Sequence, residues 1–136
     1  MNRKIYLDSC CVIYLLENVA VFGSNMRKHL QSVPDAVLCV SPLVRLEVLV
    51  KPINDGDTAL INDYEDFLRQ QQWLSINDQI IAAALQLRTR HQIKIPDAIH
   101  LATAIHYDCQ DFWTHDDHLN YAAQAAGCHV VSIKAS

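Results

Sequence analysis

Short apolar segments alternate with amphipathic segments along the chain, and this alternation constrains the fold more than any other sequence feature. The apolar segments of strand length are residues 4–7, 36–40, 73–76, 112–114 and 129–133. Strands that are apolar on both faces are typical of parallel sheets covered by helices on both sides. The segments between them have helical spacing. The predicted fold class is therefore an α/β, three-layer α/β/α sandwich with a parallel central sheet.

Residues that favour helix ends mark the boundaries of two helices around the second and third strands. Ser41-Pro42 predicts a helix start, because Ser caps helices and Pro fits their first turn. Since the residue before a proline disfavours the helical conformation, Lys51-Pro52 predicts the end of that helix. Residues 54–57 are then a loop, and residues 58–71 form an amphipathic helix.

The remaining helices follow from similar signals. Asn77 is the predicted cap of a helix that runs to about residue 90, and Gly127 is the predicted left-handed stop after residues 118–126. Three further helices are expected at residues 10–17, 24–31 and 97–107. The aromatic residues with core-facing spacing are Tyr64, Phe67, Trp73 and Trp113, so no base-stacking surface is expected among them.

A length of 136 residues suits one compact domain, and no linker or repeat interrupts the chain, so we expect a single domain over residues 1–136. The first apolar run is interrupted by Asp8 and Glu17, which is unlike a signal peptide, and no run has the length of a membrane span. The five cysteines form no Cys-x-x-Cys pair and are expected to be reduced core residues. We therefore expect a cytoplasmic protein without a membrane partner.

The net charge argues against one class of function. There are 15 acidic residues against 11 Lys and Arg, which gives a formal charge of −4. A protein that held DNA or RNA by charge neutralisation alone would need the opposite balance. The objection weakens if several carboxylates bind divalent cations, because the bound ions reverse the local charge.

Four carboxylates lie at positions that suggest a catalytic or metal-binding site. Asp8 follows the first predicted strand and Asp116 follows the fourth, and ligands of open parallel sheets bind at the carboxyl ends of strands. Asp97 lies in the first turn of a helix, and Glu47 lies between apolar residues of the helix after the second strand. Clustered carboxylates repel one another unless a cation joins them, and oxygen ligands suit Mg²⁺ or Mn²⁺.

Each acid also has an ordinary structural explanation. Asp97 favours the N-terminus of its helix, Asp8 and Asp116 are able to cap the helices that follow them, and Glu47 suits a helix surface. Taken one at a time, the acids therefore do not indicate a functional site. Taken together, they predict a metal site, at which one or two cations activate water and stabilise a leaving oxygen in phosphodiester cleavage.

The residues around these acids resemble the four acidic motifs of PIN-domain nucleases, in the family order and over nearly the whole chain. The matching stretches are Tyr6-Leu-Asp8-Ser9, Ser41-Pro-Leu-Val-Arg-Leu-Glu47, Ile95-Pro-Asp97-Ala-Ile-His-Leu-Ala-Thr-Ala104 and Thr114-His-Asp116. In its short, single-domain form the chain is similar to toxin ribonucleases of the VapC type, from toxin–antitoxin pairs.

The resemblance implies a Rossmann-like PIN fold with catalytic and metal-binding acids Asp8, Glu47, Asp97 and Asp116 around Mg²⁺ or Mn²⁺. It implies that the Ser9 and Thr114 hydroxyls support the first and fourth acids. It also implies an endoribonuclease that hydrolyses RNA phosphodiesters through metal-activated water, a cognate antitoxin as partner, and a homodimer. The family pattern selects Asp116 over the adjacent Asp117, which is left as a supporting acid or as the cap of the last helix.

Other residues invite further hypotheses. Arg88, Arg90 and Lys94 lie just before Asp97 and are candidate substrate-binding residues for phosphate groups, although a solvated helix end also explains them. The histidines of His115-Asp-Asp-His118 suggest zinc. His100 shares the helix face of Asp97 and could lie near the site, but a partly buried, hydrogen-bonded histidine is the preferred interpretation.

Two alternative functions remain open. One is a small phosphate-ester hydrolase, which is disfavoured because Cys10 stands where the usual second acid of an Asp-x-Asp pair would be. The other is a catalytically silent PIN-fold module that binds a protein partner.

Overall fold

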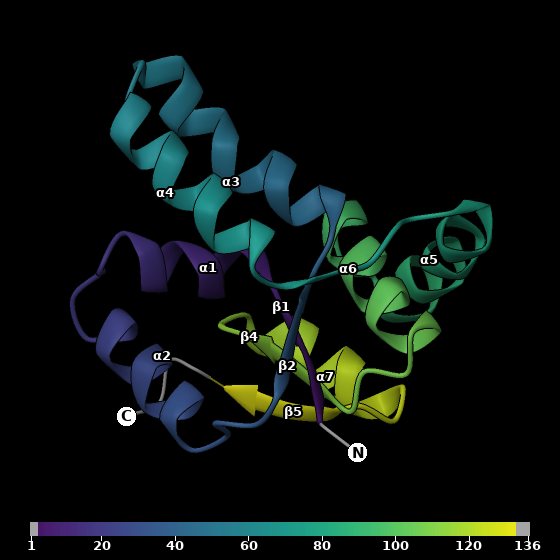
Figure 1. Cartoon of the computed structure of the whole chain (residues 1–136). Coiled ribbons are helices and arrows are strands. Elements are labelled where there is room, and N and C mark those ends of the chain that lie inside the picture. The colour runs from purple at the N-terminus through teal and green to yellow at the C-terminus, as the bar shows by residue number, and fades with distance from the viewer. Residues whose placement is uncertain (1–2, 133–136) are drawn as a thin grey trace.

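Five parallel strands form the centre of the computed structural model, which describes residues 3–132 (Figure 1). The strands are β1 (Lys4–Leu7), β2 (Val37–Val40), β3 (Gln72–Trp73), β4 (Asp111–Thr114) and β5 (His129–Ser132). Their order is β3-β2-β1-β4-β5, and every neighbouring pair is parallel, which confirms the predicted sheet. The strand order reverses between β1 and β4, where sheets of this kind bind ligands.

Residues 1, 2 and 133–136 lie outside the described part of the chain. The predicted end of the last strand at residue 133 and both ends of the predicted domain over residues 1–136 fall there. The single domain over the whole sequence therefore stays a prediction.

Helices cover both faces of the sheet. Those within residues 3–132 are α1 (Ser9–Leu16), α2 (Phe22–Gln31), α3 (Pro42–Asp55), α4 (Thr58–Arg69), α5 (Asp78–His91), α6 (Ile95–His106) and α7 (Asp117–Ala125). On β4, the Phe112 ring stacks on Tyr6, which faces His100 of α6, whereas the next residue, Trp113, meets His29 of α2. Because successive side chains of a strand point to opposite faces, α2 and α6 lie on opposite sides. The predicted three-layer sandwich is confirmed.

The core is continuous through these layers. Its largest fully buried side chains are Trp113, Tyr6, Tyr64, Phe112, Ile5, Leu7, Met26, Ile80, Ile93, Leu101 and Leu119. Tyr6, Leu7 and Phe112 come from adjacent central strands, so the carboxyl ends of β1 and β4 are held rigidly by packed neighbours. That rigid edge carries the acids described below.

The helix α3 extends past the predicted stop. Pro52 lies inside the helix and is buried, although its missing N–H removes one helical hydrogen bond. The true end is Gly56, which adopts a left-handed conformation with φ of 66°, while Asp57 N–H donates to the carbonyl of Pro52 at 2.9 Å. Packing of α3 against α4 and this stronger terminator outweigh the local effect of the proline. The predicted loop over residues 54–57 was therefore too long.

The third strand is shorter than predicted and earlier in the chain. It comprises only Gln72–Trp73 at the edge of the sheet, instead of residues 73–76. Leu74 still donates its N–H to Val40 at 2.9 Å and is buried. The expectation that Trp73 faces the core was wrong, since 41% of this residue is exposed. An edge strand of two residues leaves little sheet surface for a large side chain to pack against.

Candidate active site

Asp8 lies at the point where the strand order reverses. It directly follows β1, its N–H donates to the carbonyl of Trp113 on β4 at 3.1 Å, and only 8% of the residue is exposed. Its Oδ1 accepts the backbone N–H of Ser9 at 2.7 Å, which caps α1, and its Oδ2 accepts the hydroxyl of Thr114 at 2.6 Å. The same carboxylate is thus both a helix cap and a fixed group at the edge of the sheet.

Glu47 reaches the same region from α3. Its Oε1 accepts two hydrogen bonds, one from the Ser9 hydroxyl at 2.6 Å and one from His100 Nε2 at 2.5 Å. Burial acts to raise the pKa of Glu47, but the hydrogen bonds from His100 and Ser9 outweigh it, so the pKa lies below its ordinary value. Glu47 is therefore held as a carboxylate.

The two supporting hydroxyls do not serve the acids that the family resemblance implied. Ser9 was expected to support Asp8, but its hydroxyl donates to Glu47. Thr114 was expected to support the Asp116 carboxylate, but its hydroxyl donates to Asp8. Its bond with Asp116 involves the backbone N–H of that residue, which the hydroxyl accepts at 3.2 Å. Thr114 reaches Asp8 because the carboxyl ends of β1 and β4 lie side by side, and Ser9 reaches Glu47 because α1 contacts α3.

Asp97 lies in the first turn of α6, and its carboxyl group has a raised pKa. Burial and the negative charges of Asp8 and Asp116 raise the pKa of Asp97 from 3.8 to about 6. Because these carboxyl groups line the same cavity, their negative charges repel one another. A cation placed among them would remove this repulsion.

Asp116 is the cap of α7, and Asp117 is the first residue of that helix. The Asp116 Oδ1 accepts the N–H of Leu119 at 3.0 Å. The alternative in which Asp117 caps the last helix is therefore wrong. Capping and a place at the site do not exclude each other, because a carboxylate oxygen accepts several bonds.

All four predicted acids line one cavity of about 520 Å³. The lining residues are Asp8, Cys10, Glu47, Lys94, Pro96, Asp97, His115, Asp116 and Asp117. Ser9 and Thr114 hold the acids through the hydrogen bonds described above, without lining the cavity themselves. Cys10 and His115 reach the cavity unexpectedly, since Cys10 was predicted to be a core residue. Its Sγ lies 3.6 Å from Asp8 Oδ2.

Lys94 is the one candidate phosphate-binding residue that the structure places at this cavity. Arg88 donates instead to the carbonyl of Ile93 at 2.7 Å and lines an apolar depression with Ile81 and Leu85. Arg90 lines a different depression between α5 and α6. Because α5 turns both arginines away from the acids, the structure does not bring them to the site.

His100 also lies at the site, although no functional role was predicted for it from the sequence. It is fully buried, and its Nε2 lies 2.5 Å from Glu47 Oε1 and 3.6 Å from Asp8 Oδ1. Its position three residues after Asp97 was the signal; the expected hydrogen bond is present, but the residue is fully buried and not partly buried as expected. Among the described residues, the tightest group of metal-ligating side chains is Asp8, Glu47 and His100, with ligand atoms within 4.8 Å of one another.

The suggested zinc cluster is not assembled in the part of the chain that the structure describes. His115 hydrogen-bonds to Tyr14, while His118 Nε2 lies 3.0 Å from the carbonyl of His91 on another helix. The five cysteines are all free thiols, so none forms a disulfide. The donor set at the cavity consists mainly of carboxylate oxygens, which fits Mg²⁺ or Mn²⁺ better than zinc.

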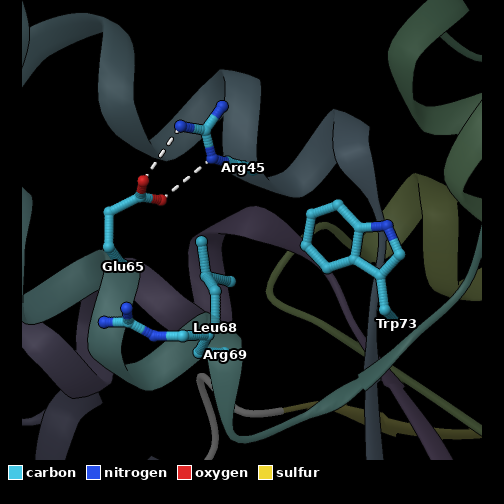
Figure 2. Close-up of a pocket in the computed structure, with 5 residues that line it drawn as sticks. All are labelled: Arg45, Glu65, Leu68, Arg69 and Trp73. Atoms are coloured by element: carbon cyan, nitrogen blue, oxygen red, sulfur yellow. Dashed lines mark hydrogen bonds and ion pairs between the residues drawn. The ribbon is translucent and has the colours of Figure 1, made fainter.

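A second depression, of about 420 Å³, lies beside β3 and is lined by two arginines, one glutamate, a leucine and a tryptophan (Figure 2). Figure 2 shows Arg45 paired with Glu65 through two hydrogen bonds of 2.9 Å, with Trp73 across the depression and Leu68 between them. Arg69, which also lines it, pairs with Asp66. Because both guanidinium groups are neutralised, this depression is a poor phosphate site despite its exposed aromatic ring.

The chain is similar to known proteins in sequence pattern and in fold. The family model described as PIN domain matches residues 5–125. No curated protein matches the chain. Among solved structures, a chain of a toxin–antitoxin complex from Klebsiella pneumoniae is 21% identical, with a TM-score of 0.74 over 95% of this chain and 97% of that one.

Two further solved structures have the same fold. VapC20 of Mycobacterium tuberculosis, described as a sarcin–ricin loop cleaving toxin, is 16% identical, with a TM-score of 0.74 over 94% of this chain and 98% of that one. A chain of FitAcB from Neisseria gonorrhoeae is 18% identical, with a TM-score of 0.69 over 97% of this chain and 99% of that one. Within residues 3–132, no helix has the length and apolar character needed to cross a membrane.

Proposed function

Because the chain belongs to the PIN domain family, we propose that it is a divalent-metal-dependent endoribonuclease and the toxin of a toxin–antitoxin pair. PIN domains are generally nucleases. The observation that carries the proposal is the convergence of Asp8, Glu47, Asp97 and Asp116 on one cavity at the switch point of the sheet. These acids come from four separate elements, and simple helix capping explains only two of them.

The four carboxylates would hold the cation, and Mg²⁺ or Mn²⁺ fits their oxygen atoms. The bound ion would supply a Lewis acid that lowers the pKa of water and offsets charge on the departing oxygen. Burial and the charges of Asp8 and Asp116 raise the pKa of Asp97, and a cation among the acids would offset the part that is due to repulsion.

The chain's own residues orient these ligands and prepare the cavity for a phosphodiester. Thr114 and the Ser9 backbone fix both oxygens of Asp8, while Ser9 and His100 fix one oxygen of Glu47. Lys94 lines the cavity and would contact a phosphate oxygen of the substrate. An acidic protein thus binds RNA at a site where the cations and Lys94 reverse the local charge.

RNA as substrate and an antitoxin as partner are the parts of the proposal that rest on relatives. The similar VapC20 is described as a toxin that cleaves the sarcin–ricin loop, and the similar Klebsiella pneumoniae chain belongs to a toxin–antitoxin complex. We propose the cytoplasm as its location, in keeping with five free thiols.

We propose a homodimer as the working form. Leu46, Val50 and Ile53 are more than half exposed along one side of α3, at spacings of four and three residues. Burying such a stripe against a second copy would remove it from water. Light scattering at micromolar concentration would show a monomer if this part of the proposal is wrong.

Cleavage of labelled RNA tests the enzymatic proposal. A hairpin RNA, an unstructured RNA and a DNA of the same sequence are incubated with the protein in Mg²⁺, Mn²⁺ or EDTA. We expect RNA cleavage only with a cation, and none from the Asp8→Asn variant. Asp8→Asn should still fold, because its amide caps α1 and bonds to the Thr114 hydroxyl, which is able to accept.

Asp63→Asn is the matched control, since it makes the same substitution at an exposed position of α4. It should cleave like the unchanged protein. Undiminished cleavage by Asp8→Asn, or in EDTA, would contradict the proposed mechanism. A folded, unchanged protein that cleaves no RNA with either cation would instead favour a silent binding module.

A further inference from the structure

The buried side chain of His100 lies between the acidic cavity and a chain of hydroxyl groups inside the fold. Its Nε2 faces Glu47, and its Nδ1 lies 2.6 Å from the hydroxyl of Tyr6. The Tyr6 hydroxyl also lies 2.8 Å from Ser41 Oγ, which caps α3 by accepting the N–H of Val44. These contacts link the start of α3 to Glu47, which lies one and a half turns further along the same helix.

The direction of the bond between His100 and Glu47 follows from the chemistry of its ends. Glu47 Oε1 also accepts the Ser9 hydroxyl, and an ionised carboxylate accepts hydrogen bonds without donating any. The proton therefore lies on His100 Nε2. In the neutral ring, Nδ1 then accepts the Tyr6 hydroxyl proton, and the Ser41 hydroxyl donates to the Tyr6 oxygen. The hydroxyls of Tyr6 and Ser41 and both ring nitrogens of His100 thereby all have hydrogen-bond partners, as buried polar groups require.

A nitrogen that carries a proton has no free electron pair for a metal. Although His100 belongs to the tightest group of metal-ligating side chains, its Nε2 is therefore a donor to a ligand instead of a ligand itself. The consequence falls on Glu47, because its Oε1 already accepts from both His100 and Ser9. Among the described residues no donor is seen at Oε2, so Glu47 is left to bind a cation through this single oxygen.

We propose that His100 is a positioning residue that aims Glu47 at the cation through its Nε2–H, with Tyr6 and Ser41 fixing the orientation of the ring. This rests on the proposed metal-dependent function and adds to it a specific requirement for a donor at residue 100. The role predicts a dependence on hydrogen-bond chemistry, whereas a core-filling role predicts a dependence on size and apolarity.

Two substitutions at residue 100 separate these roles. In His100→Gln the terminal amide N–H takes the place of Nε2–H, whereas His100→Leu is of similar size but has no donor. We expect His100→Leu to weaken Mn²⁺ binding or RNA cleavage by about 10- to 100-fold, as is typical when a hydrogen bond to a metal ligand is lost. His100→Gln should retain more of both, even though a buried amide makes it the less stable of the two variants in EDTA.

A positioning role therefore predicts opposite orders for two measurements. His100→Gln should bind Mn²⁺ more tightly than His100→Leu, but it should be the less stable variant in EDTA. If His100→Leu binds Mn²⁺ as well as His100→Gln or better, the side chain only fills space and the proposal is wrong. Tyr6→Phe extends the test, because it keeps the ring of Tyr6 but removes the bond to Nδ1. It should weaken Mn²⁺ binding although Tyr6 does not line the cavity. His106→Gln, an exposed position on the same helix, is the matched control and should change nothing.

Nitrogen NMR of the histidine rings tests the tautomer directly. The difference between spectra of the unchanged protein and His100→Gln identifies the His100 signals. We expect Nε2 to be protonated in EDTA and to stay protonated when Mg²⁺ is added, while loss of that proton on adding Mg²⁺ would make His100 a ligand and overturn the proposal. The measurement in EDTA stands even if the protein cleaves no RNA, so failure of the positioning role is distinguishable from failure of the proposed function.

Discussion

Replacing Asp97 with Asn should stabilise the metal-free protein, because the carboxylate at this position is partly buried and lies near other acids. A carboxyl group whose pKa rises from 3.8 to about 6 on folding costs the folded state about 3 kcal/mol once it is ionised. The side chain is only partly buried, so solvent screens part of this cost, and we expect a gain of about 2 kcal/mol for Asp97→Asn at pH 7.5. In a domain of this size, that raises the melting temperature by roughly 6–8 °C.

The pH dependence of this gain follows from the raised pKa. Between about pH 6 and pH 3.8 the folded protein keeps the Asp97 proton while the unfolded chain loses it, so folding binds a proton. The unchanged protein therefore loses stability from this group as the pH rises through that window, and the loss is complete above about pH 6. Asp97→Asn lacks the group, so its advantage should be full at pH 7.5 and absent near pH 3.8.

Urea unfolding in EDTA at several pH values measures this gain. Asp63→Asn makes the same substitution at an exposed site and should stay within about 0.5 kcal/mol of the unchanged protein. The reasoning is refuted if Asp97→Asn is no more stable than the unchanged protein at pH 7.5, or if its advantage persists undiminished near pH 3.8. Added Mn²⁺ should reverse the order, since only the unchanged protein retains the full ligand set and is stabilised by binding.

Two further predictions concern Asp116 and the surface pair beside β3. Asp116→Asn should lose more RNA cleavage than Asp117→Asn while melting at nearly the same temperature, because Asn still caps α7; a larger cleavage loss at Asp117 would reassign the fourth acid. A double-mutant cycle of Arg45→Met and Glu65→Gln, read by urea unfolding, should give a coupling energy of about 1 kcal/mol or less, since exposed ion pairs contribute little. A coupling well above that would show that the depression in Figure 2 is more rigid and less hydrated than its exposure suggests.

The fold followed from the sequence wherever local pattern and tertiary packing agree. The apolar runs at residues 4–7 and 36–40 became adjacent central strands, since such runs have no stable place except under helices. Ser41 and Asn77 cap the helices that they were predicted to cap, because their side chains satisfy free N–H groups of the first turn. These features depend on residues a few positions apart.

Predictions failed where a distant contact decided the outcome. Lys51-Pro52 stayed helical because α3 packs on α4 and because Gly56 supplies a better end. Trp73 was expected inside because its spacing suits a core, but β3 became a two-residue edge strand. The length of an edge strand depends on its neighbour, and the sequence of Gln72 and Trp73 does not contain that information.

The candidate site shows the same division. The positions of Asp8 and Asp116 at strand ends were readable from the sequence, because the carboxyl ends of parallel strands share one edge. The sequence did not predict that the Ser9 hydroxyl would donate to Glu47 and the Thr114 hydroxyl to Asp8. It also did not predict that Lys94 would line the cavity while Arg88 and Arg90 would lie elsewhere, because this depends on how the chain turns from α5 into α6.

The dispersal of the acids along the chain has a consequence for biosynthesis. Protein chains grow from the N-terminus, and β4, which pairs with β1 in the middle of the sheet, is synthesised after more than a hundred residues. Until then Asp8 lacks its bond from Thr114, and Asp116 has not been made. The four acids therefore meet only after residue 116 has been synthesised, so an incomplete chain on the ribosome that lacks β4 has no assembled cavity in which the proposed chemistry could begin.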